Sequence, residues 1–307
     1  MRLAIVSIVC LAACHDATGP RDSLVSNGPI VYMHRNTALH VDVWRIGPDG
    51  NGAVQLTTGS QDYIWPALSF DGGRIAYFSE DSPGGLWTMR IDGTDQRSLT
   101  TAVDIDTRFA WSPDSSRILV VNDFWKGNPI GVVNATNGAY SQIGSDTLGV
   151  QSAAWSPDGR TIAFSTSLGV PFGQASIYRM NADGSNIAPI YVPSGDTGAL
   201  YPAWSPDGSH VAFAIGPGGY DMHLVVANAD GSGVHAITSR PMCGDTTVFS
   251  NDINPAWSRD GRYIVFQRER PPCTPSNSTQ ADLYIVHASG FGLAQLTHDG
   301  TSFGPSW

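Results

Sequence analysis

The chain has 307 residues, a formal net charge of −10 and only 14% charged residues. An acidic surface repels phosphate backbones, so this balance excludes nucleic acid as an expected partner. With 41% hydrophobic residues, 34 glycines and 20 prolines, the composition fits one globular domain that has a core and many turns.

The first fourteen residues have the pattern of a secretory signal. Arg2 supplies a positive start, residues 3–11 are apolar, and Leu11-Ala-Ala-Cys14 closes the segment, which is too short to span a bilayer as a helix. The closing tetrapeptide resembles the bacterial lipobox, which implies cleavage before Cys14 and lipid attachment to its thiol. An ordinary signal peptide with a chance cysteine is the alternative.

We therefore expect residues 1–13 to be a lipoprotein signal peptide and residues 14–28 a lipidated tether. His15, rather than Asp, follows the cysteine, which in the lipoprotein pattern favours the outer membrane. The predicted location is the bacterial cell envelope, with the lipid anchor on the periplasmic side or the surface of the outer membrane.

Residues 29–58 contain three β-strand patterns. Ile30-Val-Tyr and Val43-Trp-Arg-Ile are runs of β-branched and aromatic residues, a Pro48-Asp-Gly turn follows, and the third run ends in Gln55-Leu-Thr. Such runs separated by an Asp-Gly turn predict an antiparallel meander.

A repeated motif organises the rest of the chain. Its copies are Leu68-Ser-Phe-Asp-Gly, Trp111-Ser-Pro-Asp, Trp155-Ser-Pro-Asp-Gly, Trp204-Ser-Pro-Asp-Gly and Trp257-Ser-Arg-Asp-Gly, and Pro305-Ser-Trp307 is a truncated copy. Successive anchor residues are 43, 44, 49, 53 and 50 positions apart. Repetition at this period predicts one four-stranded blade of a β-propeller per copy.

Each full unit has the same parts. A first strand ends at the anchor, a Pro-Asp-Gly turn follows, and an apolar run such as Ile162-Ala-Phe forms the second strand. A hairpin such as Asn228-Ala-Asp-Gly joins the third strand to a fourth that ends like Ala236-Ile-Thr. The second strands are apolar on both faces, as expected for strands between neighbouring sheets.

The two ends of the chain complement each other. Residues 29–58 lack a leading strand, whereas Phe303-Gly-Pro-Ser-Trp307 is a leading strand with nothing after it. Joined, they make one blade, which removes the exposed edges of an open array. Residues 29–307 are therefore predicted to form an all-β, six-bladed propeller of four-stranded antiparallel blades, closed by one C-terminal and three N-terminal strands.

With its Trp-Ser-Pro-Asp-Gly turns and Asp-Gly hairpins, the chain resembles the TolB-like, WD40-like β-propeller repeat family over about residues 29–307. The resemblance implies a periplasmic six-bladed propeller that binds other envelope proteins near its central channel. TolB carries an α/β domain before its propeller and no lipid anchor, so the resemblance does not extend to a place in the Tol–Pal system.

No motif predicts catalysis or a cofactor. Gly300-Thr-Ser302-Phe-Gly304 matches the nucleophile elbow of α/β-hydrolases, but that chemistry needs a following helix and later acid and histidine partners. The Asp-Gly turns lack the ligand spacing of a calcium loop, and none of the eight histidines forms a metal-binding pair. We expect no cofactor and no metal.

Two cysteines follow the N-terminal pair, Cys10 and Cys14. Cys243 lies in the connection into the sixth unit and Cys273 between its second and third strands, and these two loops emerge on one face. An oxidising envelope favours a disulfide between them, and two free thiols are the alternative.

The same face collects aromatic and acidic residues in the loops between second and third strands and in the connections that enter first strands. These candidate rim residues are Asp62, Tyr63, Trp65, Asp104, Asp106, Arg108, Trp125, Tyr201, Tyr220, Asp252 and Asn254. Binding residues concentrate on such loops, although any loop-rich face shows some of them. We predict a monomeric, non-catalytic module that binds an envelope protein or peptide through one channel mouth. The alternatives are a lyase or hydrolase acting on glycans or peptides, and a glycan-binding module using the same face.

Overall fold

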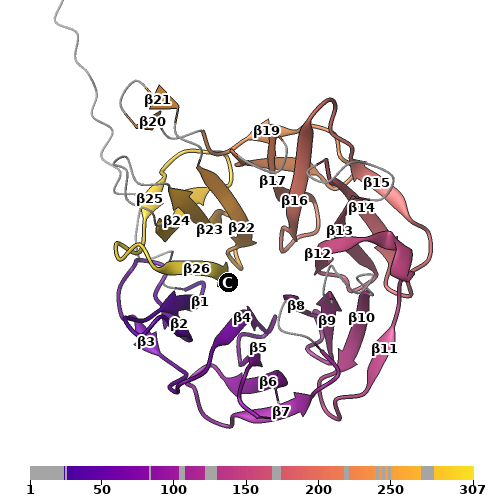
Figure 1. Cartoon of the computed structure of the whole chain (residues 1–307). Coiled ribbons are helices and arrows are strands. Elements are labelled where there is room, and N and C mark those ends of the chain that lie inside the picture. The colour runs from indigo at the N-terminus through magenta and orange to yellow at the C-terminus, as the bar shows by residue number, and fades with distance from the viewer. Residues whose placement is uncertain are drawn as a thin grey trace, which may run out of the picture.

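The computed structural model describes residues 24, 26–82, 84–103, 108–121, 130–167, 174–217, 221–239, 242–243, 246–247, 250–270 and 280–307. Six four-stranded antiparallel sheets are arranged around a central axis (Figure 1). The predicted all-β, six-bladed propeller is therefore confirmed. Within these ranges, no helix has the length and apolar character needed to cross a membrane.

The blades are numbered here in chain order, and the strands of each are given from the channel outward. Blade 1 contains β26 (Ser302–Ser306), β1 (Ile30–Arg35), β2 (Val41–Ile46) and β3 (Val54–Gln55). Blade 2 contains β4 (Tyr63–Leu68), β5 (Arg74–Ser79), β6 (Gly85–Arg90) and β7 (Arg97–Thr100). Blade 3 contains β8 (Arg108–Trp111), β9 (Arg117–Val121), β10 (Ile130–Asn134) and β11 (Tyr140–Gln142).

Blade 4 contains β12 (Val150–Trp155), β13 (Thr161–Thr166), β14 (Ser176–Asn181) and β15 (Ala188–Tyr191). Blade 5 contains β16 (Thr197–Trp204), β17 (His210–Pro217), β18 (His223–Asn228) and β19 (His235–Ala236). Blade 6 contains β22 (Asn251–Trp257), β23 (Tyr263–Arg270), β24 (Gln280–His287) and β25 (Ala294–Gln295). A short 3-10 helix (Asp146–Leu148) precedes blade 4, and a small hairpin of β20 (Met242–Cys243) and β21 (Thr246–Thr247) lies between blades 5 and 6.

The ring closes through blade 1, as predicted. Strand β26 pairs antiparallel with β1, with Phe303 opposite Met33. The indole Nε1 of Trp307 donates a hydrogen bond to the carbonyl oxygen of Gly28 at 3.1 Å. Since β26 is the innermost strand of its sheet (Figure 1), the C-terminal segment completes the channel wall.

The chain already contacts the propeller just before β1 begins. Asn27 is buried, its amide donates to the Asp260 carboxylate at 3.2 Å, and its side-chain oxygen accepts the Asp260 backbone N–H at 2.9 Å. The last residues of the predicted tether therefore already pack on blade 6.

The hydrophobic core is divided among the blade interfaces. Each of the six buried apolar clusters combines second and third strands of two neighbouring blades. Two anchor tryptophans fasten their blades directly: Trp111 donates to the carbonyl of Ala67, and Trp257 to that of Ala203, each at 3.0 Å. The anchors thus act as wedges between adjacent blades, as their size predicts.

The aspartates of the repeat motif have a structural role in the turn between first and second strands, called here the A–B turn. In blade 5, the Ser205 hydroxyl donates to the Asp207 carboxylate at 2.6 Å and accepts the His210 backbone N–H at 2.9 Å. The same pair of bonds recurs in blades 2, 3, 4 and 6. These carboxylates are therefore satisfied by turn hydrogen bonds, and the turn interpretation explains their repetition.

Candidate functional site

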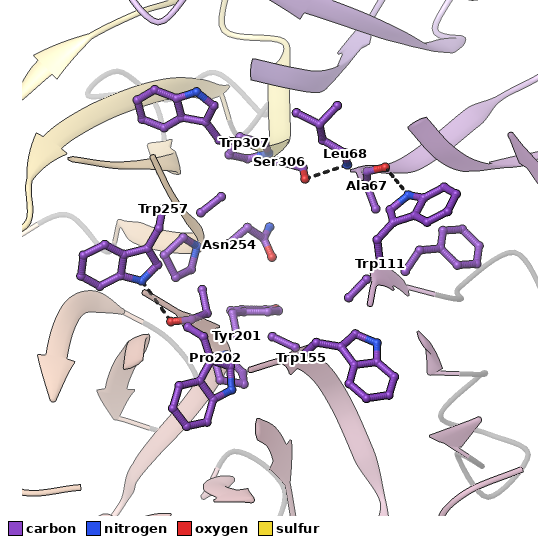
Figure 2. A pocket seen from close by; sticks show the side chains of 18 of the residues that line it. Ala67, Leu68, Trp111, Trp155, Tyr201, Pro202, Asn254, Trp257, Ser306 and Trp307 are labelled. Atoms are coloured by element: carbon purple, nitrogen blue, oxygen red, sulfur yellow. Dashed lines mark hydrogen bonds between the residues drawn. The ribbon is translucent and has the colours of Figure 1, made fainter. Parts of the chain in front are cut away.

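One residue from each innermost strand contributes to a ring inside the channel. It stands three positions before the anchor, and the six residues are Trp65, Arg108, Ser152, Tyr201, Asn254 and Gly304. All six line a cavity of about 550 Å³ on the propeller axis (Figure 2). This position of the repeat is occupied by a different residue in each of the six blades. The ring therefore distinguishes the blades from one another, whereas the anchors and turns are similar.

Four ring residues sit in β-bulges with left-handed backbone. The φ angles are 55° at Trp65, 58° at Tyr201, 54° at Asn254 and 59° at Gly304, and a proline follows each of them. The strand registers shift at these points. Positive φ is costly for bulky side chains and is found mainly where function or surrounding structure demands it.

Neighbouring blades satisfy the backbone amides that the bulges release. The Trp65 N–H donates to Met33 Sδ at 3.2 Å, and the Tyr201 N–H donates to Ser152 Oγ at 3.1 Å. The Gly304 N–H donates to Gln267 Oε1 at 2.9 Å. Each acceptor belongs to the preceding blade, so the ring is held across blade boundaries.

Arg108 reaches across the channel and joins four blades. Its guanidinium carbon lies 4.0 Å from the ring centroid of Trp65 and 5.0 Å from that of Tyr201. Its Nη1 donates to Asn254 Oδ1 at 3.1 Å. A cation between two aromatic faces is held by attraction to both ring quadrupoles. This cluster forms a floor at mid-channel.

The cavity extends from this floor toward the A–B turns. Its lining residues all lie at or after the ring position in their blades, and none lies before it. The anchor tryptophans surround it in Figure 2, and Phe70, Pro157, Pro206 and Arg259 line it at the turns. Phe70 is 52% exposed, so an apolar side chain is presented at this mouth.

The predicted rim residues divide into three groups. Trp65, Arg108, Tyr201 and Asn254 come together as described, at the floor of the cavity. Asp62, Tyr63 and Asp252 have local partners: Asp62 accepts the Val41 N–H at 2.9 Å, the Tyr63 hydroxyl donates to Asp81 at 2.8 Å, and Asp252 forms a bidentate pair with Arg268 at 2.6 and 2.7 Å. Asp104, Asp106, Trp125 and Tyr220 lie outside the described residues.

Tyr63 and Asp252 are buried and therefore do not belong to a solvent-facing rim. Asp252 is fully buried and Tyr63 is 6% exposed. Burial and the hydrogen bond to Asp81 raise the pKa of the Tyr63 hydroxyl to about 12. Both side chains therefore stabilise their blades from inside.

The cysteine predictions also fall outside the described side chains. Cys14 and Cys273 are not among the described residues, and for Cys243 only its place in β20 is described. The lipidation and the Cys243–Cys273 disulfide stay predictions.

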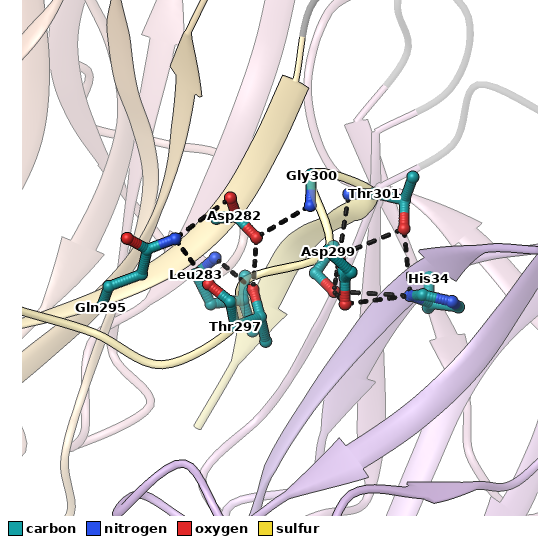
Figure 3. Close-up of polar contacts among 9 residues, drawn as sticks. His34, Asp282, Leu283, Gln295, Thr297, Asp299, Gly300 and Thr301 are labelled. Atoms are coloured by element: carbon teal, nitrogen blue, oxygen red, sulfur yellow. Dashed lines mark hydrogen bonds and ion pairs between the residues drawn. The ribbon is translucent and has the colours of Figure 1, made fainter.

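The serine of the hydrolase-like motif lies beside a histidine and an aspartate at the blade 1 seam. Figure 3 shows the histidine, His34, and the aspartate, Asp299. The Ser302 hydroxyl donates to both Asp299 carboxylate oxygens at 3.0 Å, and His34 Nδ1 lies 3.5 Å from Ser302 Oγ and from Asp299. Ser302 is fully buried within β26. Because no substrate can reach a buried hydroxyl already bonded to a carboxylate, this group fastens the closing strand and is not a nucleophile.

In the described part of the chain, no three His, Cys, Asp or Glu side chains are close enough to hold a metal ion. Asp282, beside the seam in Figure 3, is occupied by hydrogen bonds from Thr297, Gly300 and Gln295.

The chain is similar to known β-propeller proteins in sequence and in fold. Residues 27–197 match the family described as TolB beta propeller domain. The crystal structure of TolB from Acinetobacter baumannii aligns with a TM-score of 0.72 at 18% identity, covering 91% of this chain and 66% of that chain, just under two thirds of its length. The putative TolB from Agrobacterium tumefaciens aligns with a TM-score of 0.61 at 19% identity, covering 84% of this chain and 90% of that one.

An enzyme shares the same architecture. An oligogalacturonate lyase in complex with manganese aligns with a TM-score of 0.55 at 13% identity, covering 86% of this chain and 87% of that one. At such identities the likeness of solved structures shows a common fold and carries no residue role.

Proposed function

Because this chain belongs to the family of TolB β-propeller domains, we propose that it is a non-catalytic module that binds a protein or peptide partner in its central channel. The cavity above the Arg108 floor is the observation that carries the proposal. Its volume of about 550 Å³ lies within the roughly 300–1,000 Å³ typical of ligand sites. Only a short segment of a partner fits such a space.

The geometry favours entry beside the A–B turns. At that mouth Phe70 is exposed, and the walls are aromatic and proline-rich. At the other end the guanidinium of Arg108, stacked between Trp65 and Tyr201, closes the cavity. Rigid aromatic and arginine side chains are the residues that most often dominate binding energy. We therefore assign the main contacts to Phe70 at the mouth and to the floor cluster.

The proposed cell-envelope location rests on the N-terminal segment. Leu11-Ala-Ala-Cys14 supports lipidation of Cys14 and residence at the outer membrane. Asn27 is bonded to Asp260 in an A–B turn, so the chain joins the propeller on the face where the cavity lies. Fully extended, the segment from Cys14 to Asn27 spans about 45 Å. Replacement of Cys14 by alanine should move the protein from the membrane fraction to the soluble fraction, and unchanged membrane association would contradict the anchor.

Site-specific crosslinking in the native envelope tests the binding proposal. A photoreactive residue at Phe70 should yield one defined adduct, identified by mass spectrometry. The same residue at Ile187, which is 45% exposed in the outer part of blade 4, serves as the control and should not yield that adduct.

Arg108→Met then tests the floor. It keeps an unbranched apolar stem, removes the guanidinium group and its charge, and should abolish the Phe70 adduct while thermal unfolding shows an intact fold. The proposal is wrong if the adduct forms equally from Ile187 or survives loss of the Arg108 charge.

A further inference from the structure

The A–B turns that surround the mouth of the channel cavity touch one another through one pair of positions. In blades 3, 4 and 5 the second residue after the anchor is a proline, and it packs against the turn of the next blade. Pro157 of blade 4, for example, lies 3.2 Å from a β-carbon built on Gly208 of blade 5. The same contact recurs between blades 3 and 4 and between blades 5 and 6. Most of the mouth is therefore lined by prolines in mutual register with glycines.

Two turns depart from this pattern. The proline position is occupied by Phe70 in blade 2 and by Arg259 in blade 6. These two blades lie on either side of blade 1, whose first strand β26 contacts both β4 and β22 (Figure 1). Strands β26 and β1 are not consecutive, so in the described chain no A–B turn joins them. The two exceptions therefore flank the sector of the mouth that has no turn.

Arg259 crosses this sector and reaches the turn of blade 2. A β-carbon built on Gly72 would overlap the Nη2 atom of Arg259. The contact that a proline makes with the next blade elsewhere is made here by a guanidinium group from the far side of blade 1. Since Gly72 and Phe70 belong to the same turn, a cation and an exposed aromatic ring lie together at one side of the mouth.

The charge of Arg259 remains available to a ligand. Its side chain is exposed, and it forms no hydrogen bond or ion pair with any carboxylate of the described chain. The nearby Asp71 carboxylate accepts the Ser69 hydroxyl at 2.6 Å and the Gly73 N–H at 2.9 Å. The Ser69 hydrogen bond is the main cause that lowers the pKa of Asp71, and the charge of Arg259 contributes less.

The cavity differs in charge from the protein as a whole. The chain has a net charge of −10. Among the described residues that line the cavity, however, the charged side chains are two arginines, Arg108 at the floor and Arg259 at the mouth, and none is an aspartate or glutamate. A hollow lined by one sign of charge concentrates ligands of the opposite sign. The lining therefore favours an anionic group.

We propose that the segment bound in the channel carries a carboxylate beside an apolar side chain, with the carboxylate on Arg259 and the apolar side chain on Phe70. This inference rests on the proposed function and adds the chemical class of the segment. A guanidinium group donates two parallel N–H bonds to a carboxylate, and covering the exposed Phe70 ring removes apolar surface from water. The proline turns offer neither contact, so recognition is confined to the side of the mouth that flanks blade 1.

Selection from a phage-displayed library of random peptides on the immobilised full chain tests the chemical class. The wild-type protein should enrich peptides in which aspartate or glutamate adjoins an apolar residue. Arg259→Gln, which removes the charge and keeps a polar side chain, should lose the acidic preference and keep the apolar one. Arg160→Gln is the matched control, because Arg160 is an exposed arginine after the A–B turn of blade 4 and lies outside the cavity lining. It should select the same peptides as the wild type, and an unchanged acidic preference in Arg259→Gln would overturn the proposal.

A double-mutant cycle on one selected peptide then locates the carboxylate. In calorimetric titrations at low ionic strength, exchange of the acidic residue of the peptide for its amide should weaken binding to the wild type about tenfold. The same exchange should leave binding to Arg259→Gln unchanged, because the charge partner is already absent. If thermal unfolding shows that Arg259→Gln is damaged, Arg259→Pro restores the residue of the other turns and replaces it. A tenfold effect that persists in the folded variant places the carboxylate elsewhere and refutes the assignment.

Arg108→Met separates this inference from the proposed function. Peptides without acidic residues whose binding is lost in Arg108→Met would support channel binding and refute the carboxylate. Acidic peptides that depend on Arg259 but bind equally to Arg108→Met would support the carboxylate at the mouth and refute binding down to the floor. If no selected peptide depends on either arginine, both proposals are wrong.

Discussion

Replacement of Gly304 by alanine tests the channel ring at its closing strand. Gly304 has a φ of 59°, and a β-carbon there would overlap the terminal methyl group of Met33. The left-handed backbone costs a residue with a β-carbon roughly 1–2 kcal/mol, and overpacking against Met33 adds about 1–3 kcal/mol. We expect Gly304→Ala to lower the free energy of unfolding by about 2–5 kcal/mol.

Urea unfolding measures this loss, and Gly195→Ala is the matched control. Gly195 has a φ of 65°, but no atom lies within 4 Å of a β-carbon built on it. Its replacement should therefore show the backbone cost alone, about 1–2 kcal/mol. If both variants lose the same stability, the terminal methyl group of Met33 moves aside at no cost, and the predicted overpacking at the closing bulge is refuted.

Three further outcomes follow from the fold. Removal of Phe303–Trp307 should cost more than the roughly 3–5 kcal/mol of one buried aromatic side chain, and a truncated protein that melts like the full chain would disprove closure. Asp252→Asn leaves Arg268 buried beside a neutral partner, so urea unfolding should show a loss of about 3–5 kcal/mol, and a neutral effect would contradict the pairing. Hydrogen bonds from serine hydroxyls lower the pKa of Asp114 and Asp207 to about 2. Their contribution should be full above about pH 4 and disappear as the pH falls toward 2, and flat stability over that range in urea titrations would rule it out.

Most of the fold was predictable because its determinants are local and repeated. The anchor and the Asp-Gly turns predicted the blade number, the strand order and the joint closure by both termini. Two features had no such signal. The hairpin β20–β21 consists of two-residue strands, which show no periodicity. The burial of Asn27 depends on Asp260, 233 residues away.

The site was predictable in part. The sequence indicated which residues lie near the channel, but not whether their side chains point into it. Trp65, Arg108, Tyr201 and Asn254 were selected as loop-face residues, and they meet at the channel floor. The inward direction of Trp65, Tyr201 and Asn254 depends on the bulges. The available signal was the proline after three of them, because proline in a strand is confined to edges and bulges.

Ring members with a small side chain were missed. Ser152 is polar and small, and Gly304 looks like a turn residue, so only alignment of every unit on its anchor reveals them. Asp252 was selected as a rim residue although it is buried. Its partner Arg268 stands opposite it in β23, and that register cannot be read from either residue alone.

The ring explains how a repetitive scaffold acquires an individual site. The anchors and turns must stay similar, because each packs against the next blade. In blades 1, 2, 5 and 6 a bulge three residues before the anchor presents the ring position to the channel without disturbing the turn that follows. Since its amide is satisfied by Met33, Ser152 or Gln267 from the preceding blade, the ring is fixed before any ligand arrives. Specificity can therefore change by substitution at six positions, while the blades that hold them keep their common sequence.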